Sequence, residues 1–127
     1  MIILGIDPGY AIVGWGFIRF ERGRYLPLDF GAITTKAGVP FNRRLEIIYD
    51  DMTALLERYH PEAAAVEKLY FQNNKTTAID VAQARGVTML ALQQHGVPAY
   101  EYTPMQVKCA VTGFGQAHKP QVMEMTR

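Results

Sequence analysis

The first third of the chain alternates apolar runs with short polar turns, a pattern typical of β-strands. Residues 2–6 are wholly apolar, which predicts a buried central strand. Residues 12–20 and 25–34 are rich in β-branched and aromatic side chains, and the polar turn at residues 21–24 joins them. Because these connections are short, we expect three consecutive antiparallel strands.

The apolar positions then change from this pattern to a spacing of three or four residues, which is typical of a helix with one apolar face. Asn42 is expected to cap the start of this helix, and His60-Pro61 to stop it. The apolar face is expected to contain Leu45, Ile48, Met52, Leu55 and Tyr59.

The next apolar run, residues 63–67, is short enough for a buried strand and ends in a carboxylate. A second helix is expected to begin near Thr76 or Thr77 and to end at Gly96. Its apolar side is expected to consist of Ile79, Ala82, Val87, Leu90 and Ala91. Residues 97–102 predict a fifth strand, and Thr103-Pro104 and Lys119-Pro120 each predict the start of a further helix.

This order of elements predicts an α/β fold, with a five-stranded mixed sheet flanked by helices. We expect residues 1–127 to form one domain, because a chain of this length leaves no room for two. Right-handed crossover connections would place the fourth strand beside the first and parallel to it. Topology favours this placement, although the spacing of the residues alone does not require it.

Each of these two strands ends in an acid, namely Asp7 and Glu67. Ligands of open α/β sheets bind at the carboxyl ends of parallel strands. Two carboxylates at such a place are costly unless they are paired, hydrogen-bonded or bound to a cation, and hard oxygen ligands suit Mg²⁺ or Mn²⁺. The alternative is structural: Asp7 caps the Pro-Gly turn and Glu67 begins a solvated loop. On spacing alone the two interpretations are about equal.

The amino-acid composition indicates the class of protein and its cellular compartment, but it says little about the reaction. The 49% of hydrophobic residues excludes a disordered tail, and the single cysteine favours a reducing compartment. No apolar run is long enough to span a membrane and no signal peptide is evident, so a cytoplasmic location is expected. The net charge of +1 indicates no partner, but Glu124 is the only acid after Tyr102. This basic end favours a phosphate-binding face and an ordinary solvated surface about equally.

Several short motifs follow one another along nearly the whole chain. They are residues 3–9 (Ile-Leu-Gly-Ile-Asp-Pro-Gly), 65–67 (Ala-Val-Glu), 82–87 (Ala-Gln-Ala-Arg-Gly-Val), 100–102 (Tyr-Glu-Tyr), 106–108 (Gln-Val-Lys), 111–115 (Val-Thr-Gly-Phe-Gly) and Lys119. In this order they resemble the RuvC family of Holliday junction resolvases, within the ribonuclease-H-like group. The resemblance implies a homodimeric, Mg²⁺-dependent crossover junction endodeoxyribonuclease that nicks two opposing strands of a four-way DNA junction during recombination and repair. It also implies the RuvA-RuvB branch-migration complex as a partner.

The resemblance further implies roles for single residues. Asp7 and Glu67 match two catalytic, metal-binding acids, in a site that holds two Mg²⁺ ions when complete and accepts Mn²⁺ as a substitute. The roles near DNA fall on Tyr70 or Phe71, which would stack on unpaired bases, and on Lys108 and Lys119, which would contact phosphates. Residues 77–95 are the expected dimer contact, because Ala82, Ala84 and Gly86 permit close approach.

The family also has a further helix that carries two more acids, and the sequence stops at Arg127 before it. We therefore expect a site that lacks two of its usual acids, in a protein that is either a fragment or truncated. A junction-binding domain without hydrolysis is the main alternative. A nucleotide-binding ATPase of the sugar-kinase and actin type opens with a similar Gly-Ile-Asp turn, but it needs a second Gly-rich loop and a second domain.

Overall fold

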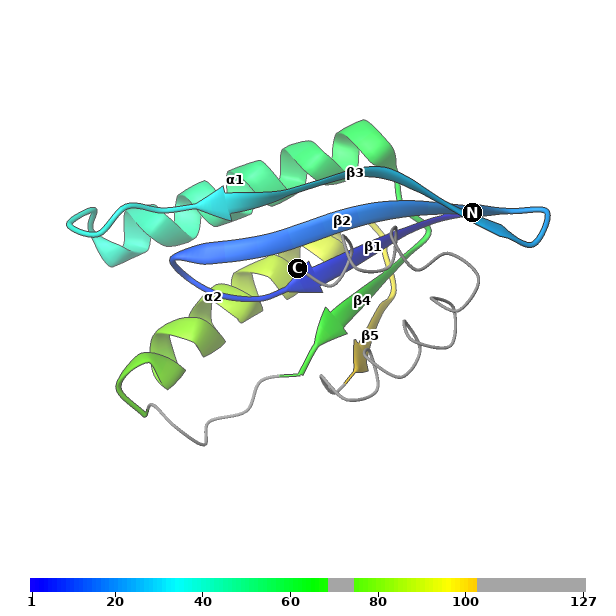
Figure 1. Cartoon of the computed structure of the whole chain (residues 1–127). Helices are drawn as coiled ribbons and strands as arrows, with labels where there is room; N and C mark the ends of the chain where they lie inside the picture. The colour runs from blue at the N-terminus through cyan, green and yellow to red at the C-terminus, as the bar shows by residue number, and fades with distance from the viewer. Residues whose placement is uncertain (69–74, 103–127) are drawn as a thin grey trace.

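A five-stranded mixed sheet is the centre of the protein, with strands in the order β3-β2-β1-β4-β5 (Figure 1). The computed structural model describes residues 1–68 and 75–102. The elements are β1 (Ile2–Asp7), β2 (Ile12–Glu21), β3 (Arg24–Thr34), α1 (Phe41–Tyr59), β4 (Ala63–Glu67), α2 (Lys75–Gln94) and β5 (Ala99–Tyr102). Strands β1, β2 and β3 are antiparallel neighbours, whereas β1, β4 and β5 run parallel. The predicted α/β fold and the placement of β4 beside β1 are confirmed; the helices expected after residue 102 lie outside the described residues.

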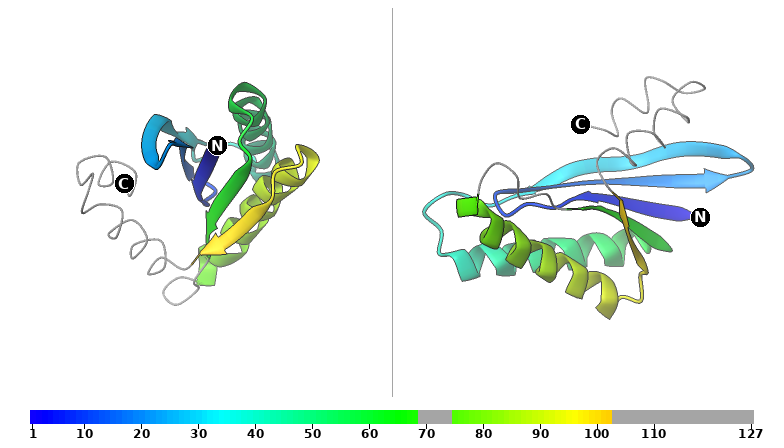
Figure 2. Two further views of the ribbon diagram at one scale, coloured as in Figure 1. Left: turned by 90° about the vertical axis from the view of Figure 1, so that its right-hand side faces the viewer. Right: turned by 90° about the horizontal axis from the view of Figure 1, so that it is seen from below.

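Both described helices cover the same face of the sheet (Figure 2). Alternate residues of the central strands point toward them, so Leu4 and Ile6 of β1 and Val66 of β4 are buried. From the helices the core receives Ile48, Met52, Leu56, Ala84, Ala91 and Leu92. Neither α1 nor α2 is long and apolar enough to cross a membrane.

The β2–β3 hairpin turns through two residues with positive φ, Arg22 at 53° and Gly23 at 76°. Two such residues in succession match the right-handed twist of the flanking strands, so the turn keeps the long strands paired. On the helix side of this hairpin the ring of Phe17 stacks on Tyr59 of α1, with centroids 4.3 Å apart. This contact fixes α1 over the antiparallel half of the sheet.

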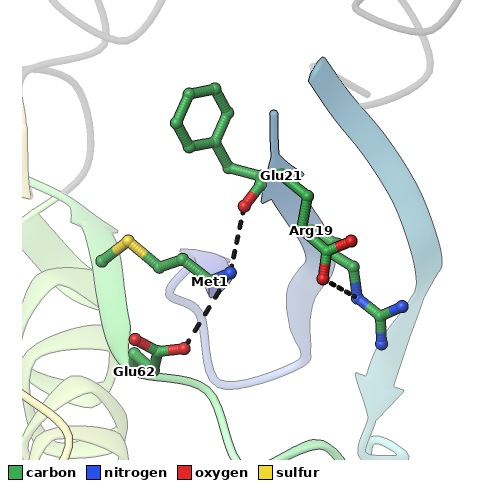
Figure 3. Close-up of polar contacts among 5 residues, drawn as sticks. Met1, Arg19, Glu21 and Glu62 are labelled. Carbon is green, nitrogen blue, oxygen red and sulfur yellow. Dashed lines mark hydrogen bonds and ion pairs between the residues drawn. The ribbon is translucent and has the colours of Figure 1, made fainter. Parts of the chain in front are cut away.

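The chain's amino terminus fixes the register of β1 against β2 (Figure 3). The Met1 ammonium donates to the Phe20 carbonyl at 3.0 Å, and the Phe20 amide donates to the Met1 carbonyl at 2.7 Å. The ammonium also lies 4.0 Å from the Glu62 carboxylate, an exposed ion pair that contributes little by itself. The register matters because a slip of one residue would exchange the two faces of β1.

The expected N-cap of α1 is wrong. The helix begins at Phe41, Pro40 occupies the cap position, and no side chain caps the helix. Pro40 has an extended backbone, with φ at −53° and ψ at 140°, and its carbonyl already accepts the Arg44 amide at 3.0 Å. Proline at the cap position leads the chain into the helix in an extended conformation, without a side-chain hydrogen bond. Asn42 therefore lies inside the first turn. The end at His60 is confirmed, since this residue is left-handed with φ at 49°.

The expected apolar side of α2 is largely wrong. Ile79 and Leu90 are 67% and 50% exposed, whereas Ala84, Thr88, Ala91 and Leu92 are buried. Small and apolar residues surround this helix on nearly every side, so their spacing does not select one face. The buried Thr88 hydroxyl donates to the Ala84 carbonyl one turn earlier, which lets a polar residue occupy the core.

We predict that Phe17→Ala lowers the free energy of unfolding by ~3–5 kcal/mol, because it removes a fully buried ring from beneath α1. Phe30→Ala, on the neighbouring strand, is the matched control. Since Phe30 is 61% exposed, its loss should change stability by less than ~0.5 kcal/mol. Urea denaturation measures both, and equal losses would contradict this account of the core.

Candidate functional site

Asp7 and Glu67 lie side by side at the carboxyl edge of the sheet. The parallel ladder pairs Ile6 with Val66, and the two acids are the next residues of β1 and β4. Their side chains are joined by a hydrogen bond. The predicted adjacency of the two carboxyl groups is therefore confirmed.

The acids occupy the sheet face turned away from α1 and α2. Side chains alternate along a strand, and Ile6 and Val66 are buried on the helix side, so the following residues project from the other face. Asp7 is exposed and Glu67 is half-buried. The buried strands thus hold two carboxyl groups at an accessible edge.

The electrostatics of the pair are unusual. Burial raises the pKa of Glu67 from 4.5 to about 7, and the hydrogen bond with Asp7 and the negative charge of Asp7 act in the same direction. Glu67 therefore keeps its proton closer to neutral pH than an ordinary glutamate does, and its carboxyl group is held beside the negative charge of Asp7.

This arrangement fits a hard divalent cation. Mg²⁺ is commonly bound by one or two carboxylates, keeps several water molecules and takes further oxygens from substrate phosphates. In residues 1–68 and 75–102 no group of three or more His, Cys, Asp or Glu side chains is placed to hold a metal. The described part of the chain brings two carboxyl groups, those of Asp7 and Glu67, together at this edge, and one or two carboxylates are common in Mg²⁺ sites.

The turn after Asp7 depends on a glycine. A β-carbon placed on Gly9 would lie 2.2 Å from the carbonyl oxygen of Ile12, which no side chain tolerates. Gly9 therefore lets the chain reverse within a few residues and pair β2 with β1 directly after the acid. This packing constraint explains the glycine of the Asp-Pro-Gly sequence.

The strand register also identifies two neighbours of the acids. Gly14 of β2 is paired with Asp7, and a β-carbon added there would lie 3.5 Å from the Asp7 β-carbon. With glycine at this position, no β2 side chain crowds the carboxylate. Tyr102 of β5 is paired with Glu67 and is 38% exposed. The sequence interpretation gave Tyr102 no role at the site; the register of β4 against β5 was the missing information.

The remaining predicted site residues are not placed by the structure. Tyr70, Phe71, Lys108 and Lys119 lie outside the described residues. Of the small residues expected at a dimer contact, Ala82 and Gly86 are exposed, but Ala84 is buried in the core of the same chain. The prediction for Ala84 is therefore wrong, because α2 uses that position to approach the sheet.

Comparison with known proteins places this site in a family. Residues 3–127 match the family model described as "Crossover junction endodeoxyribonuclease RuvC". The chain belongs to the RuvC family. The protein of that name from Brevibacillus brevis is 55% identical over 127 residues, which cover all of this chain and 76% of the relative. The Clostridioides difficile protein is 50% identical over 125 residues, covering 98% of this chain and 74% of the relative.

Solved structures of the RuvC family agree with the fold. "T. thermophilus RuvC in complex with Holliday junction substrate" is 33% identical, with a TM-score of 0.79 over 87% of this chain and 69% of the other. The likeness confirms the ribonuclease-H-like fold expected from the resemblance. The RuvC family consists of metal-dependent nucleases, and the two adjacent carboxylates agree with that chemistry.

We predict that the metal-free protein loses stability as the pH rises from about 4.5 to about 7. In this interval Glu67 keeps its proton in the folded state but has lost it in the unfolded chain. Because the folded state binds more protons, the free energy of unfolding falls as the pH rises. Thermal melting in the presence of a chelator measures this. Glu67→Gln should remove this contribution to the pH dependence, whereas Glu62→Gln, an exposed glutamate just before β4, should retain it. The same pH dependence in Glu67→Gln and the wild type would refute the raised pKa of Glu67.

Proposed function

We propose that this chain is a structure-specific endonuclease that resolves four-way DNA junctions by metal-dependent hydrolysis of a phosphodiester. The observation that carries the proposal is the hydrogen-bonded pair of Asp7 and Glu67 at the ends of adjacent parallel strands. Relatives that are 55% and 50% identical to this chain over nearly its whole length are named as crossover junction endodeoxyribonucleases. These names disfavour the alternative of a junction-binding domain without hydrolysis.

Asp7 and Glu67 are proposed to hold Mg²⁺, with Mn²⁺ as a substitute, and the complete site is proposed to hold two ions. A bound divalent cation supplies positive charge to the phosphate and lowers the pKa of water. The chain supplies the placement: the strand ends fix the Asp7 carboxylate, and the Glu67 carboxylate beside it orients the attacking water. Water attacks the phosphorus, the bond to the 3′-oxygen breaks, and the products are a 5′-phosphate and a 3′-hydroxyl.

Four further residues are proposed to contact DNA, on the strength of their matching positions in the family's motifs. Lys108 and Lys119 would each neutralise phosphate charge. Tyr70 or Phe71 would stack on bases that are unpaired at the junction, an interaction worth ~1–3 kcal/mol per base. These residues would bind the junction, while the carboxylate pair carries out the hydrolysis.

A homodimer is proposed because α2 exposes a second apolar face. Ile79 and Leu90 are 67% and 50% exposed, and Ala82 and Gly86 are exposed between them at helical spacing. Contact through this face would relate two copies by a two-fold axis, as cleavage of two opposing strands requires. The RuvA-RuvB complex is proposed as a partner from the resemblance. The cytoplasm is proposed as the location because the single cysteine favours a reducing compartment.

We predict that Asp7→Asn and Glu67→Gln each reduce junction cleavage at least ~100-fold, because each removes a negative charge from the proposed metal site. Binding to the same labelled junction should change less than ~2-fold, since the phosphate and base contacts are elsewhere. Nicking and gel-shift assays on one synthetic junction separate the two effects. Wild-type cleavage by either variant would refute the proposal.

A comparison of residues 1–127 with a longer version provides a second test of the same chemistry. A version extended through the family's acidic C-terminal helix should cut the junction far faster than residues 1–127, while both bind it. Two metal ions about 3.5–4 Å apart repel each other and need more than two carboxylates. Thermal melting of both versions distinguishes a missing ligand from lower stability, and full-speed, Asp7-dependent cleavage by residues 1–127 would contradict the need for further acids.

Lys108→Ala and Lys119→Ala are predicted to weaken junction binding and its dependence on salt. Removal of one lysine–phosphate contact should reduce the log–log slope of affinity against salt by about 0.9 on duplex arms. Arg43→Ala, which removes an exposed cation that is paired with Glu46 on α1, is the control and should leave the slope unchanged. Unchanged slopes in both variants would show that Lys108 and Lys119 do not contact phosphates.

Leu90→Glu is predicted to convert the dimer to a monomer, because it places a charge on the exposed α2 face in place of a large apolar side chain. Light scattering should give about 14.3 kDa for the variant and twice that mass for the wild type. Leu26→Glu, at an exposed leucine of β3, is the control and should remain dimeric. A wild-type monomer, or a dimer that survives Leu90→Glu, would contradict this interface.

A further inference from the structure

The turn that follows Asp7 is held by residues from two other parts of the chain. Residues 8–11 lead from β1 to β2, Thr35 follows β3, and Arg44 lies in the first turns of α1. Thr35 is 7% exposed and contacts the turn directly, and Arg44 contacts Thr35. Three segments that are distant in sequence thus meet at the turn beside the carboxylate pair.

The hydrogen bonds run from α1 to the turn: Arg44 donates to Thr35, and Thr35 donates to the turn. The Thr35 hydroxyl donates its proton to the Tyr10 carbonyl at 2.5 Å and accepts from Nε of Arg44 at 2.8 Å. A second guanidinium nitrogen of Arg44 donates to the Thr35 carbonyl at 3.2 Å, and the Thr35 amide donates to the Ala11 carbonyl at 2.9 Å. Two successive carbonyls of the turn are therefore bound through one threonine.

The charge of Arg44 is also directed at the turn. Its guanidinium carbon lies 4.9 Å from the centre of the Tyr10 ring, within the range of a cation–π contact. In the described part of the chain no carboxylate forms an ion pair with Arg44, whereas its neighbour Arg43 pairs with Glu46. Arginine is suited to this position because its planar fork can donate to the hydroxyl and the carbonyl of Thr35 together, while its face covers an aromatic ring.

We propose that Arg44 and Thr35 are positioning residues that hold residues 8–11, and through them the Asp7 carboxylate, in place beside Glu67. Asp7 is the last residue of β1, so the turn determines whether the end of the strand stays paired or frays. The inference rests on the proposed metal role of Asp7 and adds the residues that keep this carboxylate in position.

Four single variants of the full chain test the proposal. Thr35→Val removes the hydroxyl and keeps the shape, and Thr35→Ser keeps the hydroxyl. Arg44→Met removes the guanidinium from the turn, and Arg43→Met removes the same charge one residue earlier. Amide hydrogen exchange of residues 9–12 and Thr35 reports on the turn. We expect exchange at least ~10-fold faster in Thr35→Val and Arg44→Met, and near wild-type rates in Thr35→Ser and Arg43→Met.

The second measurement is the affinity of the same variants for Mn²⁺ alone, by calorimetry. Loss of a residue that orients a ligand typically weakens metal binding about 10–100-fold, so Thr35→Val and Arg44→Met should bind Mn²⁺ at least ~10-fold more weakly than the wild type. Thr35→Ser should restore the affinity. Amides of β4 provide the stability control and should exchange at the wild-type rate in all four variants.

Three results would overturn the proposal: wild-type exchange in the turn of both disruptive variants, unchanged Mn²⁺ affinity despite a loosened turn, or equal loss in Thr35→Val and Thr35→Ser. If Arg44→Met unfolds, Arg44→Lys replaces it, and an intermediate loss is expected because lysine keeps the charge without the fork. Asp7→Asn separates this inference from the proposed function. Wild-type Mn²⁺ affinity in that variant would refute the metal role of Asp7, and with it the proposal that Arg44 and Thr35 position a ligand.

Discussion

Parallel pairing of β1 with β4 is the constraint on which the site depends. It places Ile6 beside Val66, and the next residue of each strand is an acid. Helix α1 makes the crossover from β3 to β4 and covers the other face of β1 and β4. A register shift of one residue would put Asp7 and Glu67 on opposite faces. The apolar residues of β1 and β4 thus stabilise the core, and their pairing also places the two carboxylates side by side.

Two carboxyl groups in contact oppose folding unless positive charge lies between them. Burial is the main cause of the raised pKa of Glu67 and the contact with Asp7 adds to it, and a proton retained on Glu67 relieves the repulsion in the protein alone. A divalent cation would relieve it more completely, because it neutralises both groups. Asp7 and Glu67 lie on one face of β1 and β4. The buried side chains of Leu4, Ile6 and Val66 lie on the other face, where they pack against the helices. One face of β1 and β4 therefore stabilises the fold, and the other face carries the carboxyl groups of the proposed site.

The sequence was sufficient for the strands and for the pairing of the acids. Residues 63–67 were predicted as a strand with the bounds that β4 has, because a continuous apolar run that ends in a carboxylate is short enough for a buried strand. The crossover rule then predicted the contact of Asp7 with Glu67, which no local pattern encodes. The face of α2 was not predictable in this way, because Ile79, Ala84 and Leu90 are all apolar and only tertiary contacts decide which is buried. The contacts of Tyr102 and Arg44 depend on register and on long-range hydrogen bonds, which sequence spacing does not contain.

The central claim is that the ends of β1 and β4 form one cation site. A crystal structure with Mn²⁺, located by its anomalous scattering, tests this claim most directly. We predict a peak at about 2.1 Å from a carboxylate oxygen of Asp7 and from one of Glu67, with the hydrogen bond between the two groups replaced by the ion. The claim would be contradicted if, at saturating Mn²⁺, the two carboxyl groups remained hydrogen-bonded to each other with no ion between them.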